Sequence, residues 1–170
     1  PARDDMDMPG SDVPRLPPAT PPVIPDAADA TALTPQDREF ITKAISGGEF
    51  EVQSSQLALE QNVDAQLQGV AEMMIKDHTA ANAELQALAT RKGMTVPAEM
   101  ASEHQDMLDN LELAAGAEFG AKYREVQIKA HEEAIALFEE CANTSKDADL
   151  KAFAQKTLPT LREHLEMARS

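Results

Sequence analysis

Four histidines are the side chains best suited to chemistry in this sequence. They are His78, His104, His131 and His164, one on each of four predicted helices. The sequence shows no glycine-rich phosphate loop and no Ser-His-Asp arrangement, and Cys141 is its single cysteine. Imidazole nitrogens suit zinc and copper and, less selectively, manganese or iron. Any site built from these histidines must therefore be assembled from separate helices.

Composition and periodicity predict the helices that would carry them. The chain is 42% hydrophobic but only 4% aromatic, and it is rich in strong helix formers such as Ala, Leu, Glu, Gln and Lys. Apolar residues recur in steps of three and four, and strand-like runs are missing. We predict an all-α fold, with a helix break at Gly47-Gly48 because adjacent glycines weaken a helix. The expected helices span about residues 35–47, 49–61, 64–92, 98–115, 118–143 and 147–169.

The N-terminal segment has a different composition from the rest of the chain. Residues 1–34 hold eight of the eleven prolines, so we predict an extended proline-rich arm or linker there. Thr34 before Pro35 is typical of a helix start, which places a helical bundle over residues 35–170. The arm has two interpretations, a spacer or a segment that docks onto a partner protein.

Charge and hydropathy argue against two other kinds of partner. The formal net charge of -15 disfavours nucleic acid, because phosphate binding needs clustered Lys and Arg. No apolar stretch approaches the roughly 20 residues needed to span a bilayer.

Cys141 cannot form an internal disulfide, and its apolar neighbours predict a buried, inert thiol. The sequence begins with Pro1 rather than Met, so we expect that a preceding segment has been removed.

Residue counts along the helices place several polar side chains at one level. A helix rises 1.5 Å per residue. His78 lies about 15 residues from the turn near Asn62, and the same count back along the first helices reaches Glu49 or Glu51. If the helix after Pro97 returns the chain to the start of the previous helix, then the next helix runs parallel to that one. His131 then lies level with His78.

The same counting extends to the last helix. His164 falls about one turn from the level of His131, and Gln127 shares the level of His164. His104 is on the crossing helix and is expected outside the four-helix core. Two interpretations of the inward histidines remain open. They bind a metal ion together with Glu51, or they form a polar core layer with hydrogen-bonding neighbours, namely Glu51, Gln127, Ser54, Ser55 or Thr160.

Several short runs occur in an order that is typical of one family. They include Phe40-Ile41, Glu51-Val52, Met74-Ile75-Lys76-Asp77-His78, Glu118-Phe119, Leu158-Pro159 and His164-Leu165. Over about residues 35–169 this pattern resembles the exported bacterial family called domain of unknown function 4142. The resemblance implies a ferritin-like bundle located in the periplasm. It also implies that five residues occupy the family's characteristic polar positions, namely Glu51, His78, Gln127, His131 and His164.

The sequence departs from the di-iron centres of ferritin-like proteins. Those centres use a Glu from each of two helices and a Glu-x-x-His pair from each of the other two. Here Ile75 stands three residues before His78, and Leu161 stands three before His164. A single inward carboxylate cannot bridge and balance two irons, so we expect neither ferroxidase nor oxygenase activity. One divalent ion bound by histidines fits better.

We therefore predict a ferritin-like four-helix bundle with an extra crossing helix and a proline-rich N-terminal arm. We expect it to be exported, periplasmic or extracellular, and to bind zinc or copper for metal buffering or stress tolerance rather than to be an enzyme. The predicted ligands are Glu51, His78, His131 and His164, and Gln127 orients one of them. The rival hypothesis is a metal-free interaction protein whose arm, residues 1–34, docks onto a partner chain. The oligomeric state is left open.

Overall fold

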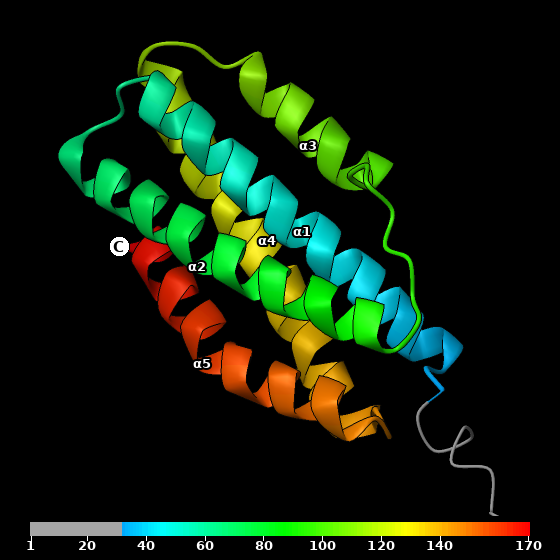
Figure 1. Cartoon of the computed structure of the whole chain (residues 1–170). Helices are drawn as coiled ribbons and strands as arrows, with labels where there is room; N and C mark the ends of the chain where they lie inside the picture. The colour runs from blue at the N-terminus through cyan, green and yellow to red at the C-terminus, as the bar shows by residue number, and fades with distance from the viewer. Residues whose placement is uncertain (1–31) are drawn as a thin grey trace, which may run out of the picture.

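The computed structural model describes residues 32–170, which form five α-helices and no strand. The helices are α1 (Pro35–Glu60), α2 (Ala65–Arg91), α3 (Ser102–Glu112), α4 (Ala117–Thr144) and α5 (Ala148–Arg169). Helices α1, α2, α4 and α5 form a four-helix bundle, and α3 packs outside it against α1 and α4 (Figure 1). The predicted fold is confirmed. Residues 1–31 of the predicted arm lie outside the described part of the chain, so docking of the arm onto a partner protein stays a prediction.

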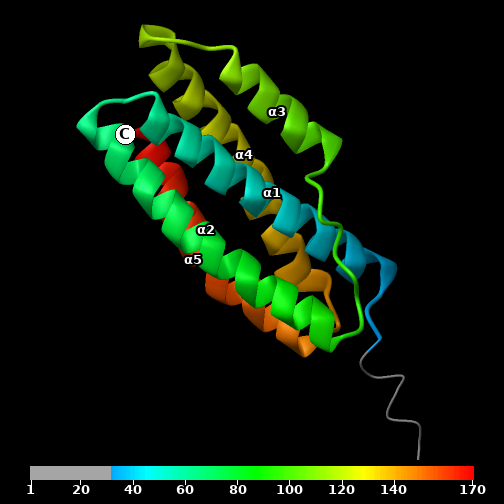
Figure 2. The ribbon, with the colours of Figure 1, turned by 45° about the horizontal axis from the view of Figure 1, so that its top comes forward.

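The direction of the helices decides which residues share a level. Helices α2 and α4 run the same way, and α1 and α5 run the opposite way, as Figures 1 and 2 both show. Helix α3 carries the chain back along the bundle between α2 and α4. One long crossover of this kind is characteristic of ferritin-like bundles. The parallel arrangement of α2 and α4 is the one that the residue counts required.

The start of α1 is fixed by a reciprocal cap. The backbone N–H of Asp37 donates to the Thr34 hydroxyl at 3.1 Å, and the Thr34 N–H donates to the Asp37 carboxylate at 2.9 Å. The Ser145 hydroxyl, at the end of α4, donates to the same carboxylate at 2.7 Å. This cap therefore ties the first turn of α1 to the turn between α4 and α5.

The predicted helix break at Gly47-Gly48 is wrong, because α1 is one continuous helix of 26 residues. The second glycine instead allows a close helix contact. A Cβ atom at Gly48 would lie 2.1 Å from Oδ1 of Asn82 on α2, whose amide donates to the Ile45 carbonyl at 3.3 Å. Packing against neighbouring helices outweighs the roughly 1 kcal/mol by which each glycine weakens a helix. The crossing helix, α3, is also shorter than predicted, because it begins after Ala101 and ends at Glu112.

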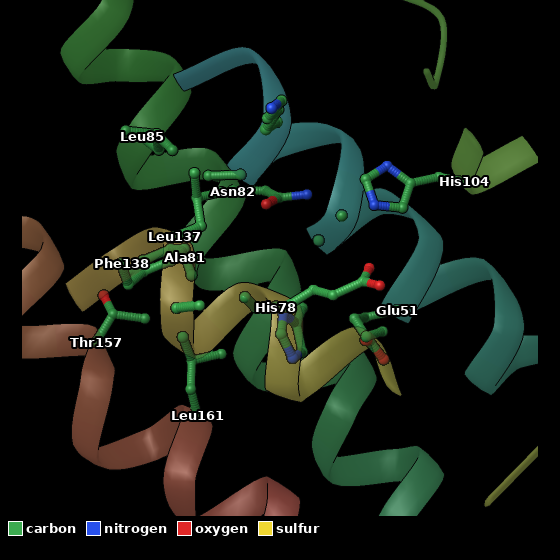
Figure 3. Close-up of a pocket in the computed structure, with 18 of the residues that line it drawn as sticks. Glu51, His78, Ala81, Asn82, Leu85, His104, Leu137, Phe138, Thr157 and Leu161 are labelled. Carbon is green, nitrogen blue, oxygen red and sulfur yellow. The ribbon is translucent and has the colours of Figure 1, made fainter. Parts of the chain in front are cut away.

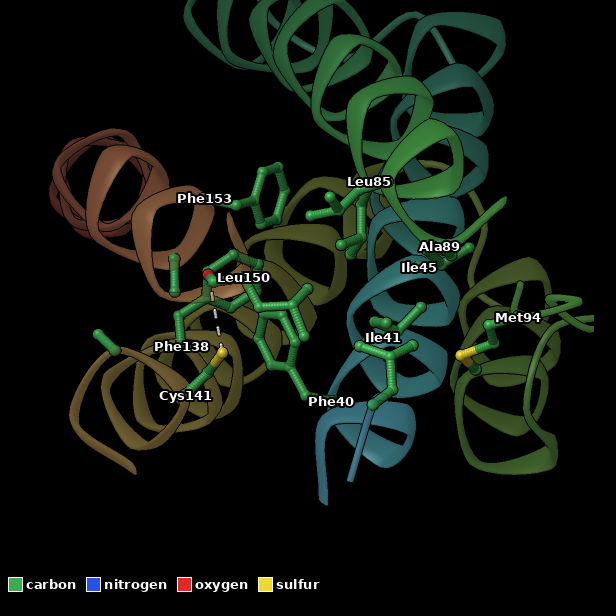
Figure 4. Close-up of a cluster of buried hydrophobic side chains, with 14 of the residues drawn as sticks. Phe40, Ile41, Ile45, Leu85, Ala89, Met94, Phe138, Cys141, Leu150 and Phe153 are labelled. Atoms are coloured by element: carbon green, nitrogen blue, oxygen red, sulfur yellow. Dashed lines mark hydrogen bonds between the residues drawn. The ribbon is translucent and has the colours of Figure 1, made fainter. Parts of the chain in front are cut away.

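Two apolar clusters make up the core, one toward each end of the bundle. The first gathers Phe40 of α1, Leu85 of α2, Phe138 of α4 and Phe153 of α5, together with Cys141 (Figure 4). The second includes Phe50, Leu67, Leu111, Phe119 and Tyr123. Along α2 and α4 the two clusters are separated by a short stretch that carries a buried histidine in each helix. The bundle therefore has a polar layer between two apolar ends.

Cys141 is buried in the first cluster and forms no disulfide. Burial raises the pKa of its thiol to about 12, so the nucleophilic thiolate form is scarce at neutral pH. The expectation of a buried thiol is confirmed. Among the described residues, no helix is both long enough and apolar enough to cross a membrane.

Candidate metal centre

Three histidines from three helices meet in the polar layer. They are His78 of α2, His131 of α4 and His164 of α5, with 8%, 0% and 1% of their surfaces exposed. One ring nitrogen of each lies within 4.8 Å of the other two. The three ring centroids are 5.3–5.5 Å apart. This spacing allows all three imidazoles to bind one metal ion.

The orientation of His131 follows from a contact within its own helix. Its Nδ1 lies 2.9 Å from the backbone carbonyl of Gln127, one turn earlier in α4. A carbonyl only accepts hydrogen bonds, so Nδ1 carries the proton and Nε2 keeps a lone pair. That Nε2 is buried and has no hydrogen-bond partner. A metal ligand of this kind commonly donates its other N–H to a carbonyl or carboxylate.

His164 is oriented by a residue that the sequence analysis did not select. Its Nε2 lies 3.1 Å from a carboxylate oxygen of Asp77 on α2. The carboxylate accepts a hydrogen bond from Nε2–H, so Nδ1 keeps the lone pair, and this atom is also buried without a partner. The sequence contains one hint of this contact, because Asp77 stands directly before His78 in the run Met74–His78. Adjacent residues of a helix point in different directions, so this hint does not predict that Asp77 contacts His164.

Burial keeps the rings of His78 and His131 neutral, because it disfavours the charged form. It lowers the pKa of His131 to about 4, and the neighbouring His164 contributes to that shift. The pKa of His78 is well below its usual value because of burial first and the other two imidazoles second. Neutral imidazole is the form that coordinates a metal ion. Nε2 of His78 is the third buried ring nitrogen without a partner.

Glu51 of α1 lies next to the histidines and is 3% exposed. Its Oε1 is 3.5 Å from Nδ1 of His131, and its Oε2 has no partner. Burial raises the pKa of this carboxyl well above its usual value, and the nearby Gln127 amide offsets only part of that shift. The candidate ligand atoms that lie within 4.8 Å of one another belong to the three histidines and do not include an oxygen of Glu51. The role of Glu51 as a ligand therefore stays a prediction.

Gln127 belongs to a hydrogen-bond chain behind the histidines. Its side-chain amide donates to the hydroxyl of Ser54 at 2.9 Å, and that hydroxyl donates to the backbone carbonyl of Glu51 at 3.3 Å. Nearby, the hydroxyls of Ser55 and Tyr123 are 2.8 Å apart. These bonds connect α1 to α4 beside the site.

A polar layer closed by its own hydrogen bonds does not describe this arrangement. Of the neighbours expected in such a layer, Gln127 and Glu51 do lie close to His131, but none of the three rings is bonded to Ser54, Ser55 or Thr160. Across residues 32–170, five buried side-chain atoms lack partners, namely Glu51 Oε2, His78 Nε2, Gln127 Oε1, His131 Nε2 and His164 Nδ1. Each such atom costs about 1–3 kcal/mol when it is left unpaired. A cation among them would satisfy the three ring nitrogens at once, so the residues present fit a metal ion.

The chain matches one known family and shares its fold with a solved structure. A family model described as "Domain of unknown function (DUF4142)" matches residues 23–170. The chain belongs to this family. No curated protein matches it. The crystal structure of a DUF305 fragment from Deinococcus radiodurans superimposes with a TM-score of 0.72 at 14% identity, covering 81% of this chain and 95% of the fragment. Similarity at that identity shows a shared fold.

The fourth histidine of this DUF4142 chain lies outside the cluster, as expected. His104 of α3 is half-buried and stacks on Phe50 with ring centroids 6.1 Å apart. Its Nδ1 lies 2.7 Å from the hydroxyl of Ser46, which also accepts the backbone N–H of Ala101 at 2.8 Å. These contacts fasten the start of α3 to α1. His104 therefore has a structural role in joining α3 to α1.

Proposed function

We propose that this protein binds one divalent transition-metal ion, zinc or copper, through His78, His131 and His164. The observation that carries the proposal is that each of these three buried, close-lying rings has a nitrogen without a protein partner. Nitrogen ligands of this type favour zinc and copper over magnesium and calcium, which prefer oxygen.

Glu51 is the proposed fourth ligand. A carboxylate beside three imidazoles completes the four-coordinate geometry that zinc favours. The bound cation would lower the pKa of Glu51, because an opposite charge at this distance stabilises the ionised form. Gln127 and Asp77 hold the ligands from behind, Gln127 through its backbone carbonyl on His131 and Asp77 through its carboxylate on His164.

The biological role we propose is metal buffering or stress tolerance in an exported, periplasmic or extracellular protein. Deep burial of all three rings favours slow exchange and retention of the ion. Family membership is consistent with this location, because the resemblance noted in the sequence implies export. Glu51 is the one carboxylate proposed as a ligand, since Asp77 contacts His164 from behind, and a single ligand of this kind suits the storage of an ion better than oxygen chemistry at two irons.

Metal binding to purified protein tests the proposal. The protein is stripped with a chelator, titrated with Zn²⁺ or Cu²⁺, and analysed by calorimetry and elemental analysis. We expect about one ion per chain in the wild type and none in a His78→Ala His131→Ala variant. Tyr123→Phe, which alters a buried polar group outside the cluster, serves as the matched control and should retain the ion. Negligible zinc and copper in all three proteins would disprove the proposal.

A further inference from the structure

A cavity of about 340 Å³ adjoins the histidine site, and Glu51 and His78 form part of its wall. The side chains that line it come from all five helices, and several of them are exposed at the protein surface. The cavity therefore connects the outside of the bundle with two of the buried polar side chains at the site.

The two sides of this cavity differ in chemistry. Leu85, Leu137 and Phe138 lie on one side of the view in Figure 3, and Glu51 and His78 lie on the other. Both residues are more than nine-tenths buried, and Oε2 of Glu51 and Nε2 of His78 have no hydrogen-bond partner. Two residues of the cavity wall, Glu51 and His78, therefore each carry an unsatisfied polar atom that can bind a cation.

Small residues from three helices create the space. Ala44 and Gly47 of α1, Ala81 of α2 and Ala134 of α4 all line the cavity. Longer apolar side chains at these positions would fill it, as they do in the apolar clusters above and below. The three alanines stay partly exposed although they pack against the first core cluster. A bundle selected for stability alone would have closed this gap.

The outer part of the cavity is rich in negative charge. Glu103 of α3, Glu133 of α4 and Glu140 of α4 line it and are exposed. Lys43 is the one cationic side chain among the lining residues, and it forms an ion pair with Glu39 at 2.7 Å. Carboxylates around an opening concentrate cations there and raise the rate at which they bind.

We infer that this cavity is the passage by which the metal ion reaches and leaves the histidine site, with Glu103 and Glu133 attracting the cation at its outer end. The inference rests on the proposed metal binding and adds to it a route and the residues that set the rate. An ion that passes the carboxylates next meets Glu51 and His78, and the rings of His131 and His164 lie directly behind.

Rapid mixing tests this passage. Metal-free protein is mixed with Zn²⁺ in the presence of a chromophoric chelator, which reports both loading and release. Ala134→Phe should fill the cavity and slow loading and release by the same factor, about tenfold or more, leaving the equilibrium affinity nearly unchanged. Ala121→Phe, on an exposed part of α4 that does not line the cavity, should load at the wild-type rate.

The charge at the outer end is tested separately. Glu103→Gln Glu133→Gln should slow loading severalfold at low ionic strength, and the difference should shrink at high salt because exposed charges are screened.

Two controls support the cavity-filling experiment. Circular dichroism checks that Ala134→Phe folds, and Ala44→Leu is a second cavity-filling variant.

Three results would overturn the passage. Unchanged rates in both folded cavity-filling variants leave the metal site standing but exclude this route. Slower loading combined with faster release shows damage to the site itself. Absence of zinc binding by the wild type, measured at equilibrium, removes the metal site and the passage together.

Discussion

Asp77 and His164 are 87 positions apart in the chain, yet a carboxylate oxygen of one lies 3.1 Å from Nε2 of the other. This contact joins α2 to α5 and determines which ring nitrogen of His164 keeps its lone pair. Because the carboxylate accepts a hydrogen bond from Nε2–H, the lone pair of Nδ1 is left free to bind a metal ion.

Replacement of Asp77 tests this orientation. Asp77→Ala should weaken zinc binding by about 10–100-fold, since partners of this kind contribute that much to metal affinity. Calorimetric titration measures the change. Glu84→Gln is the matched control, because Glu84 is an exposed acid on the same helix that pairs with Lys156 instead. Equal affinities for all three proteins would show that Asp77 does not hold the ligand in place.

The metal-free protein should lose stability in mild acid through His131. The folded state holds the pKa of His131 at about 4, below the value of about 6.5 in an unfolded chain. Between these two values the unfolded state binds more protons, so stability falls as the pH is lowered from about 6.5 to about 4. A single group shifted this far contributes a loss on the order of 3 kcal/mol.

Urea unfolding at pH 7 and at pH 4.5, with chelator present, measures this effect. His131→Gln removes the titrating ring, so the loss between the two pH values should be smaller in that variant. Glu51 works in the opposite direction, because its raised pKa makes the folded state bind the extra proton above the usual Glu range. An equal loss in wild type and His131→Gln would contradict the assignment to His131.

Removal of the fourth histidine should separate stability from metal binding. His104→Ala deletes a ring that contacts Ser46 and stacks on Phe50, so we expect a loss of about 1–2 kcal/mol in the free energy of unfolding. The zinc stoichiometry should stay at one ion per chain, because His104 lies outside the cluster. Elemental analysis and urea unfolding of the same preparation check both statements. Loss of the ion would place His104 in the site.

The two adjacent glycines of α1 should respond differently to alanine. Gly47→Ala places its Cβ at an ordinary contact distance of 3.6 Å from His104, so the better helix propensity should stabilise the protein by up to about 1 kcal/mol. Gly48→Ala meets the side chain of Asn82 at 2.1 Å and should displace it from the Ile45 carbonyl, with a net loss of about 1 kcal/mol.

A double-mutant cycle tests the cause of that difference. Gly48→Ala Asn82→Ala removes both the clash and its partner, so it should be at least as stable as Asn82→Ala alone. Thermal and urea unfolding give the four free energies. If Gly48→Ala were destabilising to the same extent with and without Asn82, then the contact with α2 would not be the reason that glycine is needed there.

Much of the candidate site could be anticipated because helices have a fixed rise per residue. His78 and His131 have nearly equal distances from the starts of two parallel helices, so their levels could be counted before the structure was known. His164 could be placed only to within one turn. Residue counts could not predict which nitrogen of each ring keeps its lone pair, because that depends on side-chain rotamers and on partners such as Gln127 and Asp77.

The sequence by itself determined the helical class, the cap at Thr34 and the inward phase of the histidines, because each of these depends on local propensity and periodicity. Only the tertiary structure decided that α1 continues through Gly47 and Gly48, that Asp77 reaches His164, and that small residues leave a cavity beside Glu51. These features depend on how closely two helices approach and which side chains meet, and those contacts are set by packing between residues far apart in the chain.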